Sequence, residues 1–440
     1  MADTGTTATP RRGAVEARRV AVAGAIGTTI EWYDFFIYGT AAAVVFGPQF
    51  FPQVSEHAGR LAAFATFAIG FIARPLGGVA MGHYGDRLGR KSMLVWSLML
   101  MGLSTLGIGL LPNYDSIGLW APALLVACRF VQGFALGGEW GGAVLMSVEH
   151  APQGRRGFFG SFVALGLPAG IILSNLVFLI ASSMVGPEAF AAWAWRIPFL
   201  ASVALVAVGL WVRLGLSESP AFAEILRTES ARRMPVVDVL RNDWRVVLLA
   251  AGSYVGISAT GYVVIVYFVS YATRELGLPL TTTLALLLTG AVLFAGSIVA
   301  CARWSDRAGR RRIMQWGCGA LVVWSIVFFP LVDTKSVPLI ALALCGMFLV
   351  QGAYIGPQPA VFSELFPTAV RYSGASLSLT LGTILGGALA PAIATTLFSM
   401  TGTSWLVTAY ITGMSMLSWL STIGVKETYR RDLTFQRSAH

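Results

Sequence analysis

The chain has 440 residues, of which 56% are hydrophobic and 12% charged, and its formal net charge is +10 at pH 7. Because a soluble domain carries about 25% charged residues, this composition excludes an ordinary soluble globular protein. The positive charge gathers in alternate loops between apolar segments, which indicates membrane topology rather than nucleic-acid binding. We therefore expect a protein that contacts membrane lipid and no nucleic acid.

Twelve apolar segments follow one another, each long enough for a transmembrane helix of about 20 residues. They cover residues 20–47, 60–82, 92–111, 119–148, 157–184, 196–215, 244–273, 282–302, 313–332, 337–363, 372–400 and 404–425. Because backbone groups in lipid must be hydrogen-bonded internally, the prediction is an all-α membrane protein. Six segments lie on each side of a polar stretch, so we expect two pseudo-symmetric six-helix bundles.

The predicted parts are a tail at 1–19, a bundle at 20–216, a linker at 217–243, a bundle at 244–425 and a tail at 426–440. Arginine and lysine concentrate in the two tails and the linker, so the positive-inside rule predicts that both termini are cytoplasmic. The basic start resembles a signal peptide, but its apolar run continues without a convincing cleavage site. We expect a retained first helix.

Two motifs occur once in each half of the chain. Residues 82–91 return in degenerate form at 302–311, half a chain length away, and the pattern E-x-x-P-x-x-x-R begins at Glu149 and again at Glu364. Such duplication is typical of transporters in which two similar halves rock about a central site. The predicted gating residues in these motifs are Asp86, Arg87, Arg90, Asp306, Arg307, Arg310, Glu149, Glu364 and Arg371. A tight basic turn that only sets topology is the alternative.

Five ionisable residues lie within the predicted spans, all in the first half: Glu31, Asp34, Arg74, Arg129 and Glu139. Each costs about 2.5–3.5 kcal/mol if central and unpaired, so such residues normally face a bundle interior or a watery cavity. Asp34 and Arg129 are expected at a similar depth, where a contact that breaks as access changes would bind and release a proton. A static ion pair between two helices is the alternative.

The other three intramembrane charges have several interpretations. Glu31 lies one turn before Asp34 on the same helix face, where it is either a second proton site or a partner for Arg74 or Arg129. Arg74 and Glu139 lie nearer the cytoplasmic ends of their helices, which favours a gate or an inter-helix salt bridge over substrate contact.

Polar and aromatic residues within the spans complete a candidate substrate pocket with Arg129. They are Tyr33, Tyr38, Gln132, Asn175, Tyr254, Tyr262, Gln351, Tyr354 and Gln358. Each is also compatible with ordinary packing or an interfacial position. The four cysteines have no metal-binding spacing and the four histidines fall in or near loops, so we expect no metal site, no cofactor and no enzymatic activity.

These motifs resemble the major facilitator superfamily. Residues 82–91 read G-x-x-x-D-R-x-G-R-K and residues 129–133 read R-x-x-Q-G. A narrower resemblance, to the metabolite:proton symporter family, rests on residues 31–35, 74–78 and 132–142. Within that family, the chain resembles the shikimate transporter branch at residues 50–91 and 121–149. The resemblance implies a twelve-helix fold and proton-driven import across a bacterial inner membrane. It also implies that the Asp86 carboxylate faces a helix N-terminus and basic partners and latches the cytoplasmic side.

The expected function is therefore proton symport of a small organic acid, such as a shikimate-like monocarboxylate or a dicarboxylate, by alternating access in a monomer. Arg129 would attract the carboxylate and Asp34 would carry the proton. One alternative is symport of a zwitterionic osmolyte such as proline or betaine. Transporters of that type carry a long C-terminal coiled coil, whereas the tail at 426–440 is short and has no heptad repeat, which is evidence against this alternative. Another is proton-driven export of drugs or metabolites, whose signature G-P-x-x-G-G is absent. A sensor without transport activity is a third.

Overall fold

The structure, a computed structural model, describes residues 10–88, 90–152, 154–214, 235–367 and 370–429, and these contain helices and no strand. Ten helices in this part of the chain are long and apolar enough to cross a membrane. The other two predicted segments are also helical, although the apolar part of one, Val95–Leu110, is shorter than the ten. The all-α prediction is confirmed.

The first half contains six long helical segments, two of them interrupted. Its elements are α1 (Pro10–Val44), α2 (Phe46–Phe50), α3 (Glu56–Leu88), α4 (Arg90–Leu110), α5 (Tyr114–Ile117), α6 (Trp120–Ala135), η1 (Leu136–Gly138), α7 (Glu139–Glu149), α8 (Arg156–Ala164), α9 (Gly166–Ala192), η2 (Ala194–Arg196) and α10 (Ile197–Leu214). A 3₁₀ turn, η1, separates α6 from α7 inside the fourth predicted segment. Gly186, at a φ of 78°, kinks the helix near the end of α9.

The second half repeats this plan after the short helix α12 (Pro235–Asn242). Its elements are α13 (Trp244–Tyr262), η3 (Val263–Tyr267), α14 (Phe268–Arg274), α15 (Leu280–Ala308), α16 (Arg310–Val332), α17 (Val337–Ile355), α18 (Gln358–Leu365), α19 (Arg371–Thr383), η5 (Ile384–Ala388), α20 (Ala390–Thr401) and α21 (Trp405–Gly424). Both η3 and η5 are π-helical turns inside long helices. Such turns are rare and frequently mark functional positions.

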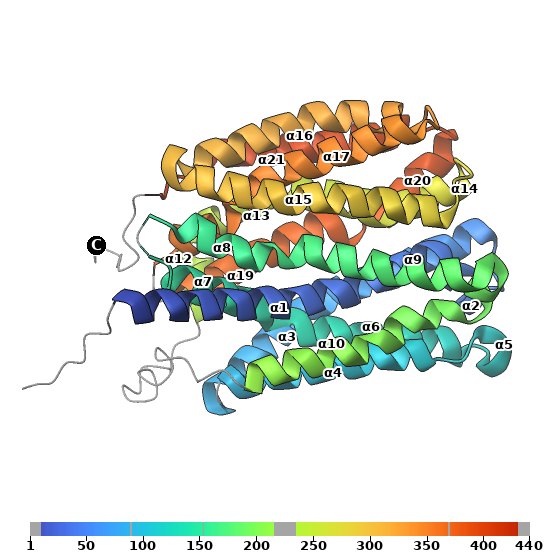
Figure 1. The fold of residues 1–440 in the computed structure, drawn as a ribbon, viewed down its shortest axis with the longest axis horizontal. Coiled ribbons are helices and arrows are strands. Elements are labelled where there is room, and N and C mark those ends of the chain that lie inside the picture. The colour runs from blue at the N-terminus through green and yellow to red at the C-terminus, as the bar shows by residue number, and fades with distance from the viewer. Residues whose placement is uncertain (1–9, 89, 153, 215–234, 368–369, 430–440) are drawn as a thin grey trace, which may run out of the picture.

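The long helices lie side by side, and α1 begins at the same end of the bundle at which α21 ends (Figure 1). We call this the terminal end, and the other, where α5 and α14 lie, the opposite end. The two halves meet where α15 packs along α8 and α9 and where α19 packs against α7 and α3. The helices α1 and α3, which carry several of the functional side chains described below, contact η3, η5, α14 and α20 of the second half.

Glycine permits a close helix contact in the first half, between α3 and α6. A Cβ atom at Gly133 would clash with the backbone of Gly70, and one at Gly77 would clash with the Phe134 carbonyl. A Cβ at Gly70 would lie 2.7 Å from Nε of Arg129. Small residues of this kind let transmembrane helices approach closely, and here they also make room for a buried guanidinium.

We expect Gly133→Ala to destabilise the protein by about 1–3 kcal/mol, because the added methyl group must push α3 and α6 apart. Gly296→Ala is the matched control, since a Cβ there would meet nothing within 4 Å. Thermal unfolding in detergent measures both. If the Gly133→Ala and Gly296→Ala proteins unfold at the same temperature, the contact between α3 and α6 is not tight.

Candidate functional site

Four fully buried side chains form a polar chain across α1, α4 and α6. The Thr105 hydroxyl donates to Oδ2 of Asp34 at 2.9 Å, and Nε2 of Gln132 donates to the Thr105 oxygen at 2.8 Å. Nη1 of Arg129 donates to Oε1 of Gln132 at 2.5 Å. Two neutral side chains therefore connect the carboxylate to the guanidinium.

Asp34 and Arg129 make no direct contact in this closed state; the predicted contact, which forms and breaks as access changes, stays a prediction. The two residues do share one buried network, as their similar depth predicted. Gln132, one turn along α6, accepts from Nη1 of Arg129 and donates to Thr105, so it lies between the two charges. Oδ1 of Asp34 has no hydrogen-bond partner among the described residues.

The Arg129 guanidinium lies among aromatic rings rather than beside an anion. Its central carbon is 4.2 Å from the ring centroid of Tyr38, 4.5 Å from that of Phe35 and 4.9 Å from that of Phe67. Cation–π contacts of this kind stabilise a desolvated charge by about 2 kcal/mol or more. Nε and Nη2 of Arg129 make no hydrogen bond to any described residue. Two donors thus remain available for a carboxylate.

A second charged pair includes Glu31, which lies one helical turn before Asp34 on α1. Nη2 of Arg74 is 3.5 Å from Oε1 of Glu31, and the Arg74 guanidinium lies over Phe35 at 5.1 Å and Phe71 at 5.3 Å. The structure thus places Glu31 with Arg74 rather than with Arg129. Glu139, at the start of α7, is also buried.

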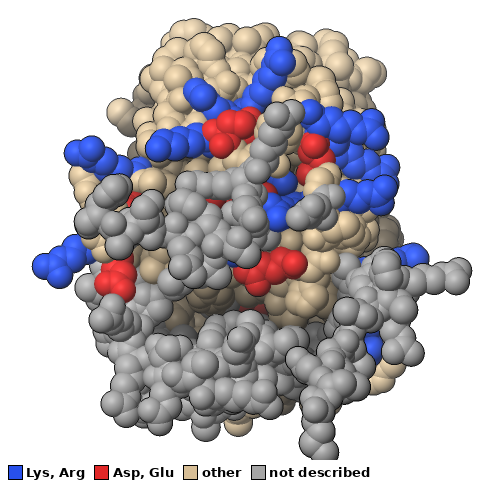
Figure 2. All heavy atoms as spheres, turned by 90° about the vertical axis from the view of Figure 1, so that its left-hand side faces the viewer, with Lys and Arg blue, Asp and Glu red and all other residues tan. Residues whose placement is uncertain are grey.

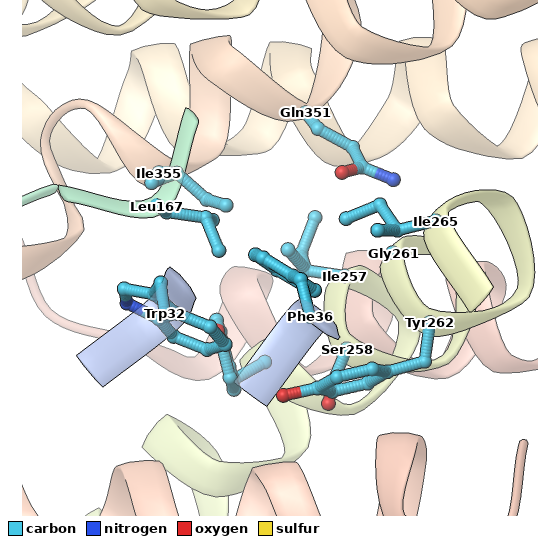
Figure 3. A pocket seen from close by; sticks show the side chains of 11 residues that line it. Trp32, Phe36, Leu167, Ile257, Ser258, Gly261, Tyr262, Ile265, Gln351 and Ile355 are labelled. Atoms are coloured by element: carbon cyan, nitrogen blue, oxygen red, sulfur yellow. The ribbon is translucent and has the colours of Figure 1, made fainter. Parts of the chain in front are cut away.

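A small cavity lies between the halves (Figure 3). Its walls are Trp32, Phe36, Leu167, Tyr254, Ile257, Ser258, Gly261, Tyr262, Ile265, Gln351 and Ile355, from α1, α9, α13, η3 and α17. Its volume of about 20 Å³ is room for about one water molecule. The halves must separate before a metabolite can enter.

Tyr262 extends from the second half into the aromatic cluster around the buried charges of the first half. Its ring centroid is 5.2 Å from that of Phe71, 5.6 Å from that of Phe35 and 5.7 Å from that of Phe67. Its buried hydroxyl has no hydrogen-bond partner among the described residues. Tyr262 therefore fills space between the cavity and the Arg129 region.

Of the remaining predicted pocket residues, two line the cavity and two belong to the polar chain or its aromatic shell. Tyr254 and Gln351 are in the cavity wall. Gln132 is in the polar chain, and Tyr38 packs on Arg129 while its hydroxyl donates to Thr66 at 2.6 Å.

Four others do not line the cavity in this closed state. The Tyr33 hydroxyl donates to the Pro198 carbonyl at 2.7 Å, and Asn175 donates to the carbonyl of Ile171 at 2.8 Å. The Tyr354 hydroxyl is 2.7 Å from that of Ser253. Gln358 is buried, and its Nε2 has no hydrogen-bond partner among the described residues.

Several site residues carried no distinguishing signal in the sequence. Thr105 resembles any other threonine in an apolar helix, yet it is the link between Asp34 and Gln132. The spacing of Phe67 and Phe71, four residues apart and just before Arg74, could have indicated an aromatic face beside a charge.

At the terminal end, Asp306 joins the halves through a helix N-terminus. Its Oδ1 accepts the backbone N–H of Gly157 at 2.8 Å and its Oδ2 accepts that of Phe158 at 2.9 Å. Both amides belong to the first turn of α8, where a carboxylate is stabilised by the helix dipole by about 0.3–1 kcal/mol, and by more when partly buried. The second copy of the repeated motif therefore acts as an inter-half contact.

Ion pairs surround this contact. Glu364 lies 3.1 Å from Arg310 and 3.5 Å from Arg156, and Arg371 lies 3.2 Å from Glu149. Lysine and arginine side chains ring the acidic groups on this face (Figure 2). Arg307, predicted as a gating residue, is exposed and makes no ion pair with a described residue. The side chains of Asp86, Arg87 and Arg90 lie outside the described residues.

Two further ion pairs join the halves at the opposite end, and the sequence interpretation missed them. Arg60 of α3 lies 3.3 Å from Glu275, and Arg274 of α14 pairs with Glu56. Ionic contacts therefore hold both ends together at once, which agrees with the small central cavity. The structure is a closed, occluded state.

We expect Asp306→Asn to loosen the terminal end, because the neutral amide loses the attraction to the α8 dipole and to Arg310. With a reporter Ser258→Cys in a protein without its four native cysteines, maleimide labelling of the cavity should rise about tenfold, a shift of about 1.4 kcal/mol. Arg307→Gln is the control: it removes the charge of a neighbouring side chain that makes no ion pair with a described residue, so labelling should stay unchanged. Equal labelling of both variants would contradict the assignment.

Comparisons with known proteins agree with this architecture. A family model described as Major Facilitator Superfamily matches residues 24–391. An inner membrane metabolite transport protein of Escherichia coli (strain K12) is 40% identical, covering 94% of this chain and 95% of that protein, and the shikimate transporter of the same organism is 38% identical with the same coverage. The solved structure of the proton:xylose symporter XylE aligns with a TM-score of 0.75 at 18% identity, covering 94% of this chain and 97% of that one.

Proposed function

Because the chain belongs to the Major Facilitator Superfamily and is a multi-pass membrane transporter rather than an enzyme, we propose that it imports a small organic acid together with a proton. The observation that carries this proposal is the polar chain from Asp34 to Arg129. It offers a proton acceptor and an anion site on one network that the lipid does not reach. The proton gradient alone drives the cycle, without a cofactor.

Arg129 is the proposed anion site. Its charge is stabilised by aromatic faces, while Nε and Nη2 lack acceptors. Leaving a buried donor unpaired costs about 1–3 kcal/mol, and more for a charged group, so a carboxylate that reaches these donors is favoured. A guanidinium accepts a carboxylate through two parallel hydrogen bonds, which suits one carboxylate per site.

Asp34 is the proposed proton site. A buried carboxylate without an ion-pair partner is unfavourable, and proton uptake removes the charge. The Thr105 hydroxyl can follow that change, since Oδ2 of Asp34 and the Met101 carbonyl both lie 2.9 Å from it. Within this network, a change in the protonation of Asp34 then needs only a rotation of the Thr105 hydroxyl.

Direction of transport rests on the charge distribution. The basic residues of the described chain concentrate at the terminal end (Figure 2), which the positive-inside rule assigns to the cytoplasm. The opposite end then faces the outside of a bacterial inner membrane. A proton gradient directed inward favours import by a symporter, and the relative described as a shikimate transporter supports an acid as substrate.

Zwitterionic osmolytes remain the second candidate, because they also present one carboxylate to Arg129. A monoanion that moves with one proton carries no net charge, so only the pH gradient drives it, at about 1.36 kcal/mol per unit. A zwitterion with one proton also responds to voltage, at about 2.3 kcal/mol per 100 mV. Uptake with the voltage collapsed and the pH gradient kept distinguishes the two.

We expect Asp34→Asn to abolish accumulation driven by a pH gradient, because the amide carries no transferable proton, while exchange of internal for external substrate persists. Purified protein in proteoliposomes is tested with radiolabelled shikimate, 2-oxoglutarate, benzoate and betaine. One pH unit supports about tenfold accumulation of a coupled monoanion by the wild type. Asp115→Asn, at an exposed acidic residue of α5, is the control. Full accumulation by the Asp34→Asn protein would disprove the coupling role.

Arg129→Lys separates the anion site from the proton site. Lysine keeps the positive charge but loses the planar donor fork, so the apparent KM for the transported acid should rise about tenfold, as for one lost charged hydrogen bond. Accumulation at saturating substrate should still follow the pH gradient. An unchanged KM would remove Arg129 from the substrate site.

A further inference from the structure

A second and larger hollow lies at the opposite end, between α3 of the first half and η3, α14 and α20 of the second. Its volume is about 230 Å³, and its polar walls include Arg60, His57 and Glu275. The central cavity does not include any of these residues. Because the hollow lies between the halves, whatever binds there touches both.

Arg60 has unused binding capacity in this hollow. Its Nη1 lies 3.3 Å from Oε1 of Glu275, while its buried Nε has no hydrogen-bond partner among the described residues. A guanidinium in good geometry binds a carboxylate through two hydrogen bonds, so the pair with Glu275 is incomplete. His57 lines the same hollow one turn before Arg60.

We propose that this hollow is an outer anion site, where the carboxylate of the transported acid replaces Glu275 on Arg60 and thereby releases one of the ion pairs that close the opposite end. The inference rests on the proposed function and adds a second binding site to it. In this exchange Arg60 keeps one carboxylate partner, while Glu275 turns to solvent. The exchange also links substrate arrival directly to opening.

The other walls define the substrate class. The rings of Tyr267 and Tyr271 stack with centroids 5.8 Å apart, and Phe398 lies edge-on to Tyr271 at 5.3 Å. The Tyr271 hydroxyl is turned to Asp333 at 2.7 Å, so this residue offers its ring to the hollow. Drug-sized ligands occupy pockets of about 300–1,000 Å³. The site therefore suits a small monocarboxylate with a ring or compact apolar body.

A continuous helix connects the two sites. Tyr262 and Ile265 line the central cavity, and Tyr267, at the end of the π-helical turn η3, lines the hollow. Glu275 follows directly after α14 on the same segment. Release of Glu275 therefore removes one of the two ion pairs that hold the segment that also carries Tyr262, the side chain that covers the Arg129 region.

The test compares apparent KM values for uptake of radiolabelled shikimate into proteoliposomes. Arg60→Gln should raise the KM about tenfold, as expected for a lost charged hydrogen bond. Glu275→Gln should lower it about threefold, since the competing partner is removed and an exposed ion pair contributes little. If the wild type does not take up shikimate, 2-oxoglutarate or benzoate replaces it, whichever the wild type accumulates.

Lys335→Gln is the matched control, because it removes an exposed charge at the same end of the bundle from a side chain that does not line the hollow and makes no ion pair with a described residue. It should leave the KM within about twofold, as is usual for exposed charges.

Opposite shifts for Arg60→Gln and Glu275→Gln support the outer site, because a simple latch would respond in the same direction to the loss of either partner. Shifts of the same sign, or no shift, in a wild type that accumulates the acid overturn the outer site alone. A wild type that accumulates no acid of the panel overturns the proposed function and the outer site with it.

Discussion

The structure depends on how a charge is accommodated where no water reaches it. Arg129 is stabilised by three aromatic faces and one amide, and Asp34 by one hydroxyl, with two neutral side chains between them. A direct ion pair would satisfy both charges and would hold α1 and α6 together in every state of the cycle. The indirect arrangement leaves each charge with open hydrogen-bonding capacity. That incompleteness is what a site for a transient proton and a transient anion requires, since a fully satisfied pair gains little from either ligand.

The charged contacts at the two ends of the bundle differ in how deeply they are buried. At the terminal end, Glu364 and Arg310 are almost fully buried, with side-chain exposures of 0% and 2%, and a carboxylate closes on two free amides of α8. At the opposite end, the Glu275 and Glu56 side chains are 32% and 71% exposed. Exposed pairs contribute about 0–1 kcal/mol each, whereas hydrogen bonds from amides to a carboxylate are about twice as strong as neutral ones. The opposite end is therefore the easier one to open, which agrees with the proposed uptake of substrate from that side.

The sequence predicted the helices, the duplicated halves and the buried charges, because each has a one-dimensional signal: apolar length, repeat spacing and rarity of ionisable residues in lipid. It did not predict how Asp34 and Arg129 are connected. Position along a helix gives the depth of a residue but not the rotation of its side chain, and here Gln132 and Thr105 lie between the two charges. The pairs of Arg60 with Glu275 and of Arg274 with Glu56 were missed for a different reason. Residues at loop ends have no periodicity, and only the packing of two halves brings them together.

Tyr262 explains how events in one half reach the other. Its ring occupies the aromatic cluster of the first half, although its backbone belongs to α13 of the second. A carboxylate that approaches Arg129 from the cavity must share that space, so anion binding and the closed position of Tyr262 exclude each other in part. Tyr262 directly precedes the π-helical turn η3, where the regular helical hydrogen bonding is interrupted. A displacement of the Tyr262 ring is most easily absorbed at this turn. The turn is followed by α14 and the ion pairs of the opposite end. Tyr262, the turn η3 and the second-half partners of the opposite-end ion pairs, Arg274 and Glu275, thus lie on one continuous segment. In the proposed cycle, a local competition for space around Tyr262 becomes a movement between the halves.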